Sequence, residues 1–220
     1  MITPNLFRAL RPGPVEVDGR TWSLTVHELG VLRVPNGKLE ACDPFVTLGE
    51  GPVVDVPAGD YPAYVTVADV SDAQDGSHLR EAYLSLRFAE GEVAAVEAAT
   101  NADEELGEDE FWMVAVDAGT VGFVDAEAVR TLMPEGDWYE DLFENGRDDS
   151  WFALMDSPEH LIEGCANIVL PLATEGENLV LAHSGWGDGA YPLVRTVDAA
   201  GRTLGIHIDL LVVGPESDDQ

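Results

Sequence analysis

The chain has 220 residues, enough for one large domain or two small ones with a hydrophobic core, and its 42 acidic against 11 basic residues give a formal net charge of −31. Nucleic-acid binding and attachment to an anionic membrane both need a basic surface, so this charge disfavours them. No apolar run approaches the roughly 20 residues of a membrane span, and residues 1–8 lack the apolar core of a signal peptide. We therefore expect a cytoplasmic protein.

The acidic charge is unevenly distributed along the chain. Residues 1–40 hold four acidic and five basic residues, whereas residues 101–160 hold 18 acidic residues and two arginines, a net charge of −16. An acidic bias of a whole proteome, as in a salt-adapted cell, would spread more evenly. The clustering therefore favours an acidic surface that engages a basic protein partner, as in an immunity or antitoxin-type protein. General acidity without a function is the alternative.

The pattern of residues predicts a β-rich fold. An extended arm is expected at residues 1–14 and a frayed tail at 215–220. Alternating or β-branched segments predict strands at 22–27, 31–34, 53–56, 61–68, 79–88, 168–172, 179–182, 191–197 and 204–213. Residues 93–98 fit a strand or a short helix. Residues 111–117 form a nearly continuous apolar run, which predicts a central strand buried on both faces.

Three helices are expected between residues 125 and 164. Asp125 is a good N-cap for a helix over 126–133, an aromatic and leucine stripe predicts a second over 137–144, and Pro158 predicts a third over 157–163. The absence of alternating strands and helices argues against a doubly wound sheet. We predict an α+β fold, β-dominated and mostly antiparallel, with one domain over residues 15–214.

One sequence pattern occurs twice. Gly59-Asp60-Tyr61-Pro62 is followed by Thr66-Val67, and Gly189-Ala190-Tyr191-Pro192 is followed by Thr196-Val197 at the same offsets. One hypothesis is two related β-subdomains around an acidic helical insert at 101–164. Coincidence is the other, because a turn that leads into a strand favours these residue types.

The densest unusual chemistry is the stretch 183–192, where three glycines surround Trp186 and Asp188 and precede Tyr191. Alternating glycines leave one face of the backbone bare, so another segment or a ligand can approach it closely. We expect this loop to pack against another element or to rim a pocket, with Trp186 at least partly buried. Trp186, Tyr191 and Tyr61 are therefore candidate binding residues.

Two turn-borne acids, Asp43 and Asp188, suggest an alternative function. In one cleft they would suit a carboxylate-based hydrolase, which would need Mg²⁺ or Mn²⁺ as its cofactor. The competing interpretation gives both residues to turns, since Asp43 precedes Pro44 and Asp188 precedes Gly189. No nucleophile elbow, P-loop or dinucleotide-binding motif occurs in the sequence. No cofactor is expected under the binding hypothesis.

A metal site would draw on His183, His207 and Asp209. His207 and Asp209 share one face of a strand, but Leu211 and Val213 share it too, so a buried histidine satisfied by the aspartate is the competing interpretation. Cys42 and Cys165 make no metal spacing, and we expect two reduced, buried thiols or one long-range disulfide. In the acidic helical segment, Trp138 and Trp151 are candidate binding residues, against simple packing of that segment onto the sheet.

Several of these motifs together resemble one protein family. They are Gly37-x-Leu39-x-Ala41-Cys42-Asp43-Pro44-Phe45, Val56-Pro57-x-Gly59-x-Tyr61-Pro62, Asp117-Ala118-Gly119-x-x-x-Phe123-x-Asp125, Gly187-Asp188-Gly189-x-Tyr191-Pro192, Asp198-x-x-Gly201 and Ile208-Asp209-Leu210. As a set they resemble the bacterial DUF4241 family over roughly residues 20–213. This family has no assigned function, so the resemblance implies no activity and no catalytic residues.

Overall fold

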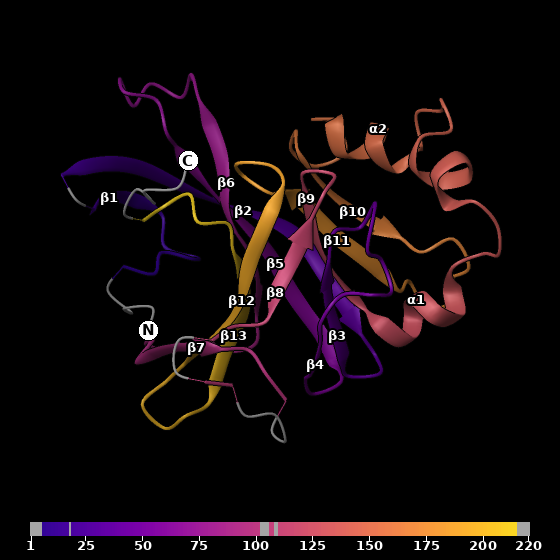
Figure 1. Cartoon of the computed structure of the whole chain (residues 1–220), viewed down its shortest axis with the longest axis horizontal. Coiled ribbons are helices and arrows are strands. Elements are labelled where there is room, and N and C mark those ends of the chain that lie inside the picture. The colour runs from indigo at the N-terminus through magenta and orange to yellow at the C-terminus, as the bar shows by residue number, and fades with distance from the viewer. Residues whose placement is uncertain (1–5, 18, 102–105, 108–109, 215–220) are drawn as a thin grey trace.

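The computed structural model describes residues 6–17, 19–101, 106–107 and 110–214, which form two β-sheets and a layer of short helices (Figure 1). The first sheet has the strand order β1-β2-β5-β6-β13-β12-β7, and β8 pairs with the beginning of β12. Its strands are β1 (Gly13–Val17), β2 (Arg20–Val34), β5 (Gly59–Asp69), β6 (Leu79–Arg87), β7 (Ala95–Ala98), β8 (Met113–Val116), β12 (Gly189–Val197) and β13 (Thr203–Asp209).

The second sheet has the order β10-β11-β9-β3-β4. Its strands are β3 (Lys38–Cys42), β4 (Val53–Asp55), β9 (Thr120–Asp125), β10 (Cys165–Val169) and β11 (Asn178–His183). The outer face of this sheet is covered by α1 (Ala126–Leu132), the π-helical turn η1 (Tyr139–Phe143) and α2 (Trp151–Asp156) (Figure 1). Antiparallel pairing joins the strands of both sheets, so the predicted α+β class is confirmed. No helix in the described ranges is long and apolar enough to cross a bilayer.

Two hydrophobic cores follow from this layering. One lies between the sheets and the other lies between the five-stranded sheet and the helices. Strand β9 serves both, because Val121 and Phe123 enter the first core and Val124 enters the second. Cys42 and Cys165 are free, buried thiols, in agreement with the first of the two interpretations of these residues.

The prediction of a central, doubly buried strand at 111–117 is wrong. Within β8, Met113 and Ala115 are exposed while Val114 and Val116 are buried, so only one face of the strand is covered. Its strand partner is β12, and its other face meets solvent. All six residues of β9 are buried, and it is this strand that lies between two layers.

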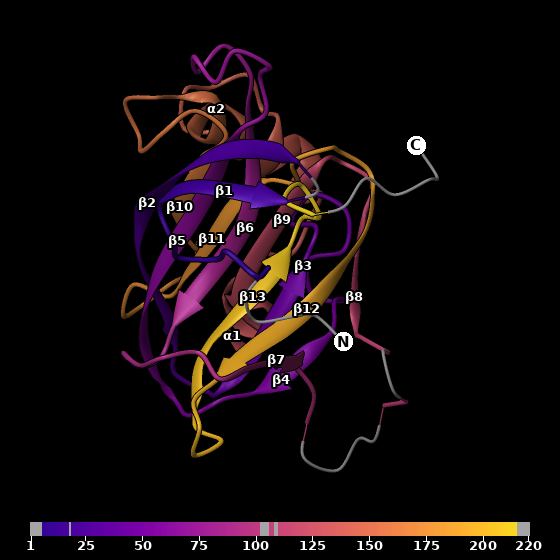
Figure 2. The same ribbon diagram turned by 90° about the vertical axis from the view of Figure 1, so that its left-hand side faces the viewer.

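The strands predicted at 22–27 and 31–34 are one continuous strand, β2. A bulge between Glu28 and Val31 bends it, and Gly30 adopts a φ of 86° at that point. The half of β2 that precedes the bend pairs with β1 and lies at a steep angle to β12 and β13 (Figure 2). The predicted arm partly belongs to the core, because the buried Phe7 ring lies 5.0 Å from that of Tyr83.

The predicted third helix at 157–163 is also wrong. The helix is α2, which begins after Ser150, whose hydroxyl accepts a hydrogen bond from the Ala153 amide. Pro158 follows the end of this helix rather than opening a new one. The second predicted helix is reduced to η1, and the strand expected at 168–172 is β10, three residues earlier at its start.

Two hairpins of the larger sheet match residue by residue. In β5–β6 Thr66 lies opposite Tyr83, in β12–β13 Thr196 lies opposite Gly205, and a bulge follows each threonine. Because β6 and β13 pair with each other, an approximate twofold rotation relates the hairpins. The repeated sequence pattern thus occupies equivalent backbone positions, and the origin of two subdomains by duplication stays a prediction.

Candidate functional site

Asp43 lies at the end of β3 and is completely buried. Its Oδ2 accepts hydrogen bonds from the amides of Asp117 (2.9 Å) and Ala118 (2.7 Å). Its Oδ1 accepts from the Thr120 hydroxyl (2.6 Å) and the Phe45 amide (3.2 Å). Four donors on two carboxylate oxygens leave no free acceptor for a substrate or a metal ion. The geometry therefore gives Asp43 the turn-forming role, while Asp188 is exposed in the loop 184–188.

The loop 184–188 packs against the larger sheet, as its glycines predicted. A Cβ at Gly185 would lie 2.6 Å from the Glu81 carbonyl oxygen and 2.7 Å from Val212. Trp186 is 45% exposed, and its ring lies 5.7 Å from the guanidinium carbon of Arg80. Trp186 is thus partly buried, which confirms the expectation for this side chain.

Tyr61 and Tyr191 are buried and make the same local contact. Each hydroxyl donates to a carbonyl four residues earlier, of Pro57 and Gly187 respectively. Burial raises the pKa of both phenols. The Tyr191 hydroxyl closes the loop 184–188, whereas the Tyr61 ring lines an open pocket.

His207 does not pair with Asp209, contrary to the competing interpretation. Its ring nitrogens contact the hydroxyls of Ser85 (2.9 Å) and Thr196 (3.1 Å). Burial lowers the pKa of His207 to about 3 and raises the pKa of Asp209 to about 7. Burial therefore favours the neutral form of both side chains.

The three candidate metal ligands do not converge. His183 lies on β11 of the smaller sheet, and His207 and Asp209 lie on β13 of the larger one. Across the described ranges, no three His, Cys, Asp or Glu side chains are grouped so that they could hold a metal ion.

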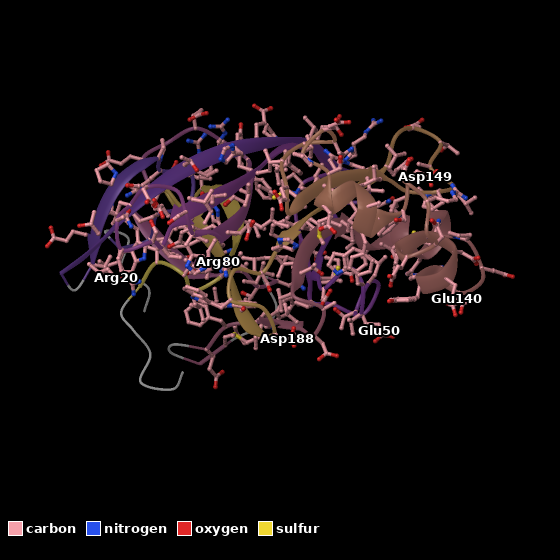
Figure 3. All side chains as sticks on the ribbon, turned by 90° about the horizontal axis from the view of Figure 1, so that it is seen from above. Arg20, Glu50, Arg80, Glu140, Asp149 and Asp188 are labelled. Carbon is pink, nitrogen blue, oxygen red and sulfur yellow. The ribbon has the colours of Figure 1, made fainter. Side chains whose placement is uncertain are left out.

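The helical layer, residues 126–163, presents an acidic outer surface. It contains 11 acidic residues and two arginines, and all of the acids except Glu127 are exposed. Both arginines pair with acids of the same segment, Arg130 with Glu127 and Arg147 with Asp149. Figure 3 places Glu140 and Asp149 at the outer edge of this layer, at the opposite end of the molecule from Arg20.

Aromatic side chains fasten this layer to the sheet. Trp151 is 3% exposed and its ring lies 4.9 Å from that of Phe143, so it belongs to the core rather than to a binding surface. Trp138 is half-buried, and its indole N–H donates to the Pro134 carbonyl. The aromatic residue that faces solvent is Tyr139, which is 51% exposed. Packing therefore explains Trp138 and Trp151, whereas Tyr139, which was not among the candidate binding residues, is the exposed ring.

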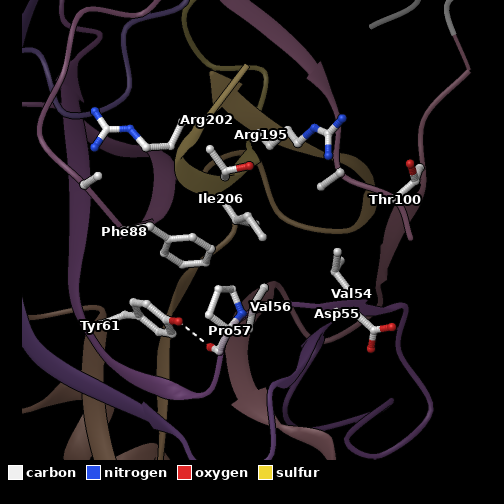
Figure 4. A pocket seen from close by; sticks show the side chains of 13 residues that line it. Val54, Asp55, Val56, Pro57, Tyr61, Phe88, Thr100, Arg195, Arg202 and Ile206 are labelled. Carbon is white, nitrogen blue, oxygen red and sulfur yellow. Dashed lines mark hydrogen bonds between the residues drawn. The ribbon is translucent and has the colours of Figure 1, made fainter. Parts of the chain in front are cut away.

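A pocket of about 540 Å³ lies where the ends of β5, β6, β12 and β13 meet the edge strand β4. Arg195 and Arg202 lie along one rim, Tyr61 and Pro57 lie across from them, and Phe88 and Ile206 lie between (Figure 4). The rings of Tyr61 and Phe88 are 4.3 Å apart. Pockets of this size, apolar with a few polar groups, are typical of small-molecule sites.

Of the pocket residues, the sequence pointed to Tyr61 alone. The lining comes from segments that are far apart in the chain, and no spacing in the sequence links them. One signal was present, because the repeated Gly-x-Tyr-Pro pattern marks two equivalent strand entries, of which one is preceded by a Trp-containing loop and the other is not.

Comparison with known proteins gives one match. A family model described as "Protein of unknown function (DUF4241)" matches residues 32–208. No curated protein and no solved structure was found to match the chain.

Proposed function

Because the chain belongs to the DUF4241 family, whose function is unknown, we propose a function from its surface: the helical layer binds a basic protein partner. The proposal describes a bacterial cytoplasmic binding protein of the immunity or antitoxin type. The observation that supports it most is the charge of residues 126–163, 11 acids against two arginines that are already paired within the segment.

The shape of the layer supports the same function. Four of its aromatic side chains, Trp138, Phe143, Trp151 and Phe152, pack inward and hold short helical segments on the five-stranded sheet, so the carboxylates are left facing outward. Three large apolar side chains are exposed on or beside this layer: Val46, Tyr139 and Leu172. Apolar side chains surrounded by charges are common in protein interfaces, where the apolar part gives affinity and the charged rim gives orientation and speed.

The charge has a kinetic consequence. A field of one sign accelerates the association of an oppositely charged protein by about 10- to 1,000-fold. This steering depends on salt, since the screening length falls from about 30 Å at 0.01 M to about 3 Å at 1 M. A partner held chiefly by the acidic surface should therefore associate rapidly at low salt and slowly at high salt.

The test is capture from a lysate of the source cell on the immobilised protein. We expect a basic protein to be retained at low salt and released as the salt concentration is raised. Retention of acidic or neutral proteins only, or of no protein at low salt, would contradict the proposal. Ribonuclease treatment of the lysate is the control for nucleic acid that bridges the two proteins.

A further inference from the structure

The pocket beside Arg195 and Arg202 has a counterpart in the other hairpin, and the two differ in one respect. Equivalent backbone bonds set the correspondence: the Phe88 amide donates to the Leu204 carbonyl (2.8 Å), and the Leu210 amide donates to the Ala82 carbonyl (3.0 Å). The strand registers extend it. The pocket residues Tyr61, Phe88, Arg202 and Thr203 correspond to Tyr191, Leu210, Arg80 and Glu81.

In the counterpart, the loop 184–188 occupies the equivalent space. A Cβ at Gly185 would lie 2.6 Å from the Glu81 carbonyl oxygen and 3.5 Å from Leu210. The Trp186 ring lies 5.7 Å from the Arg80 guanidinium carbon. The loop thus contacts the counterparts of three pocket-lining residues and places an indole ring against the counterpart of Arg202.

A difference in loop length explains why the pocket beside Tyr61 is open, whereas the equivalent place beside Tyr191 is filled by the loop 184–188. In the smaller sheet, Asp55 on β4 lies opposite Lys38 on β3, and His183 on β11 lies opposite Thr120 on β9. These two strand pairs flank the central pair β3–β9, and their outer strands β4 and β11 lead into β5 and β12. Six positions separate Asp55 from Tyr61, whereas eight separate His183 from Tyr191. The shorter connection has no residue that corresponds to Trp186, and the pocket of about 540 Å³ is found there.

From this comparison we infer that the open pocket binds a small planar aromatic acid. The aromatic ring occupies the space that Trp186 fills in the counterpart, beside the paired rings of Tyr61 and Phe88. Arg202, on the rim, is the equivalent of Arg80, whose guanidinium lies against the Trp186 ring in a contact between a cation and an aromatic face.

The acidic group of the ligand follows from the rim. Arg195 and Arg202 are two of only 11 basic residues in a chain with a net charge of −31. Their ion pairs with Glu97 and Asp198 are made at the surface, where such pairs contribute little. Within the described ranges, the hydrogen bonds of each guanidinium use Nε and Nη2, so Nη1 of each can donate to a carboxylate. The nearby Asp55 pairs with Lys38, which lessens its repulsion of an anion.

The probe is indole-3-acetate, measured by calorimetry and by the methyl resonance of Ile206 in the pocket. Ile168, in the other core, is the control methyl group. We expect saturable binding that shifts Ile206 and leaves Ile168 unchanged. Indole, which lacks the acid, should bind at least about tenfold more weakly than indole-3-acetate. Absence of saturable binding, or equal binding of indole, would overturn the inference.

The equivalent arginines provide a matched pair of variants. Arg202→Gln should weaken the binding of indole-3-acetate about tenfold, because it removes a charged donor from the rim. Arg80→Gln removes the same charge from the counterpart and should leave binding unchanged. The side chain of Arg202 is 60% exposed, so its replacement should not disturb the fold. Circular dichroism of both variants checks this before binding is measured. Equal loss of affinity in the two variants would contradict the site, since it would reflect total charge only.

Discussion

Asp43 and Asp125 lie at the ends of two paired strands, and each accepts hydrogen bonds from the turn that precedes the other's strand. Asp43, at the end of β3, accepts hydrogen bonds from the turn between β8 and β9, at the amides of Asp117 and Ala118. Asp125, at the end of β9, accepts from the turn between β2 and β3, at the amide (2.8 Å) and side chain of Asn36. Because β3 and β9 pair antiparallel, the two contacts are reciprocal. Two of the acids in this chain are therefore structural.

Replacing Asp43 with alanine should lower the free energy of unfolding by about 3–5 kcal/mol, because four donors, two of them fully buried, lose their acceptor. Asp43→Asn keeps an acceptor and should cost less. Urea denaturation measures both. Asp72→Ala, at an exposed position, is the control and should stay within about 0.5 kcal/mol of the wild type. A stable Asp43→Ala protein would remove the structural role and reopen the catalytic hypothesis.

The loop 184–188 contains two glycines that separate steric from conformational effects. Gly185 and Gly187 have φ values of 71° and 99°, but a Cβ would clash with the Glu81 carbonyl at Gly185 and meet nothing within 4 Å at Gly187. Gly187→Ala should cost about 1–2 kcal/mol, for the left-handed backbone alone. Gly185→Ala should cost clearly more. Thermal unfolding of both variants tests this order. Equal losses of stability would mean that the loop shifts away from the Glu81 carbonyl without cost.

Trp186→Ala should cost about 1–2 kcal/mol, because the ring is 45% exposed and a fully buried aromatic residue would cost about 3–5 kcal/mol. The variant also opens the space beside Arg80. Added indole should then raise the melting temperature of Trp186→Ala more than that of the wild type. If indole does not raise the melting temperature of the variant, the loop has collapsed into the space that the ring leaves.

The stability of the core depends on pH through two opposed groups. In the folded state the pKa of Asp209 is about 7, above its unfolded value, so its contribution is present at low pH and is lost as the pH rises through 7. The pKa of His207 is about 3, below its unfolded value, so its contribution is lost as the pH falls from the unfolded value towards 3. Between about pH 4 and 6.5 the two slopes oppose each other.

Asp209→Asn should reveal this opposition. The difference in unfolding free energy, variant minus wild type, should increase with pH between about 4 and 7, by at most about 1.4 kcal/mol per pH unit. The amide side chain of the variant retains an acceptor for the Leu211 amide, so the comparison isolates the titration. A difference that is flat across this range would show that Asp209 titrates normally. Denaturation curves at fixed pH intervals give the measurement.

The elements that follow from local chemistry were predictable from the sequence. Asp125 caps α1 as expected, since an N-cap depends on its own turn. Strand β9 was missed because Gly119 and Gly122 resemble turn residues. Gly122 lies within the strand for a tertiary reason: a Cβ there would lie 2.6 Å from Pro44 and 3.1 Å from the Val180 carbonyl. Such an approach between distant segments leaves no local trace.

The candidate sites also differ in whether they depend on local sequence or on tertiary packing. The close packing of the loop around Trp186 followed from its alternating glycines, which is local information. The pocket was missed because its walls come from both matched hairpins and from β4, and only the three-dimensional register shows that Arg202 and Arg80 are equivalent. The burial of Trp151 was equally a matter of tertiary packing.

The central claim, that the helical layer is a binding surface, is tested most directly by two variants of equal charge. One neutralises four exposed acids of the layer: Glu135→Gln, Glu140→Gln, Asp141→Asn and Asp148→Asn. The other neutralises four exposed acids elsewhere: Glu16→Gln, Glu28→Gln, Asp72→Asn and Glu92→Gln. The measurement is the affinity of each variant for the captured basic partner at low salt. The account predicts that the first variant loses at least about tenfold in affinity while the second stays close to the wild type. Equal losses in both variants, or a loss in the second only, would contradict it.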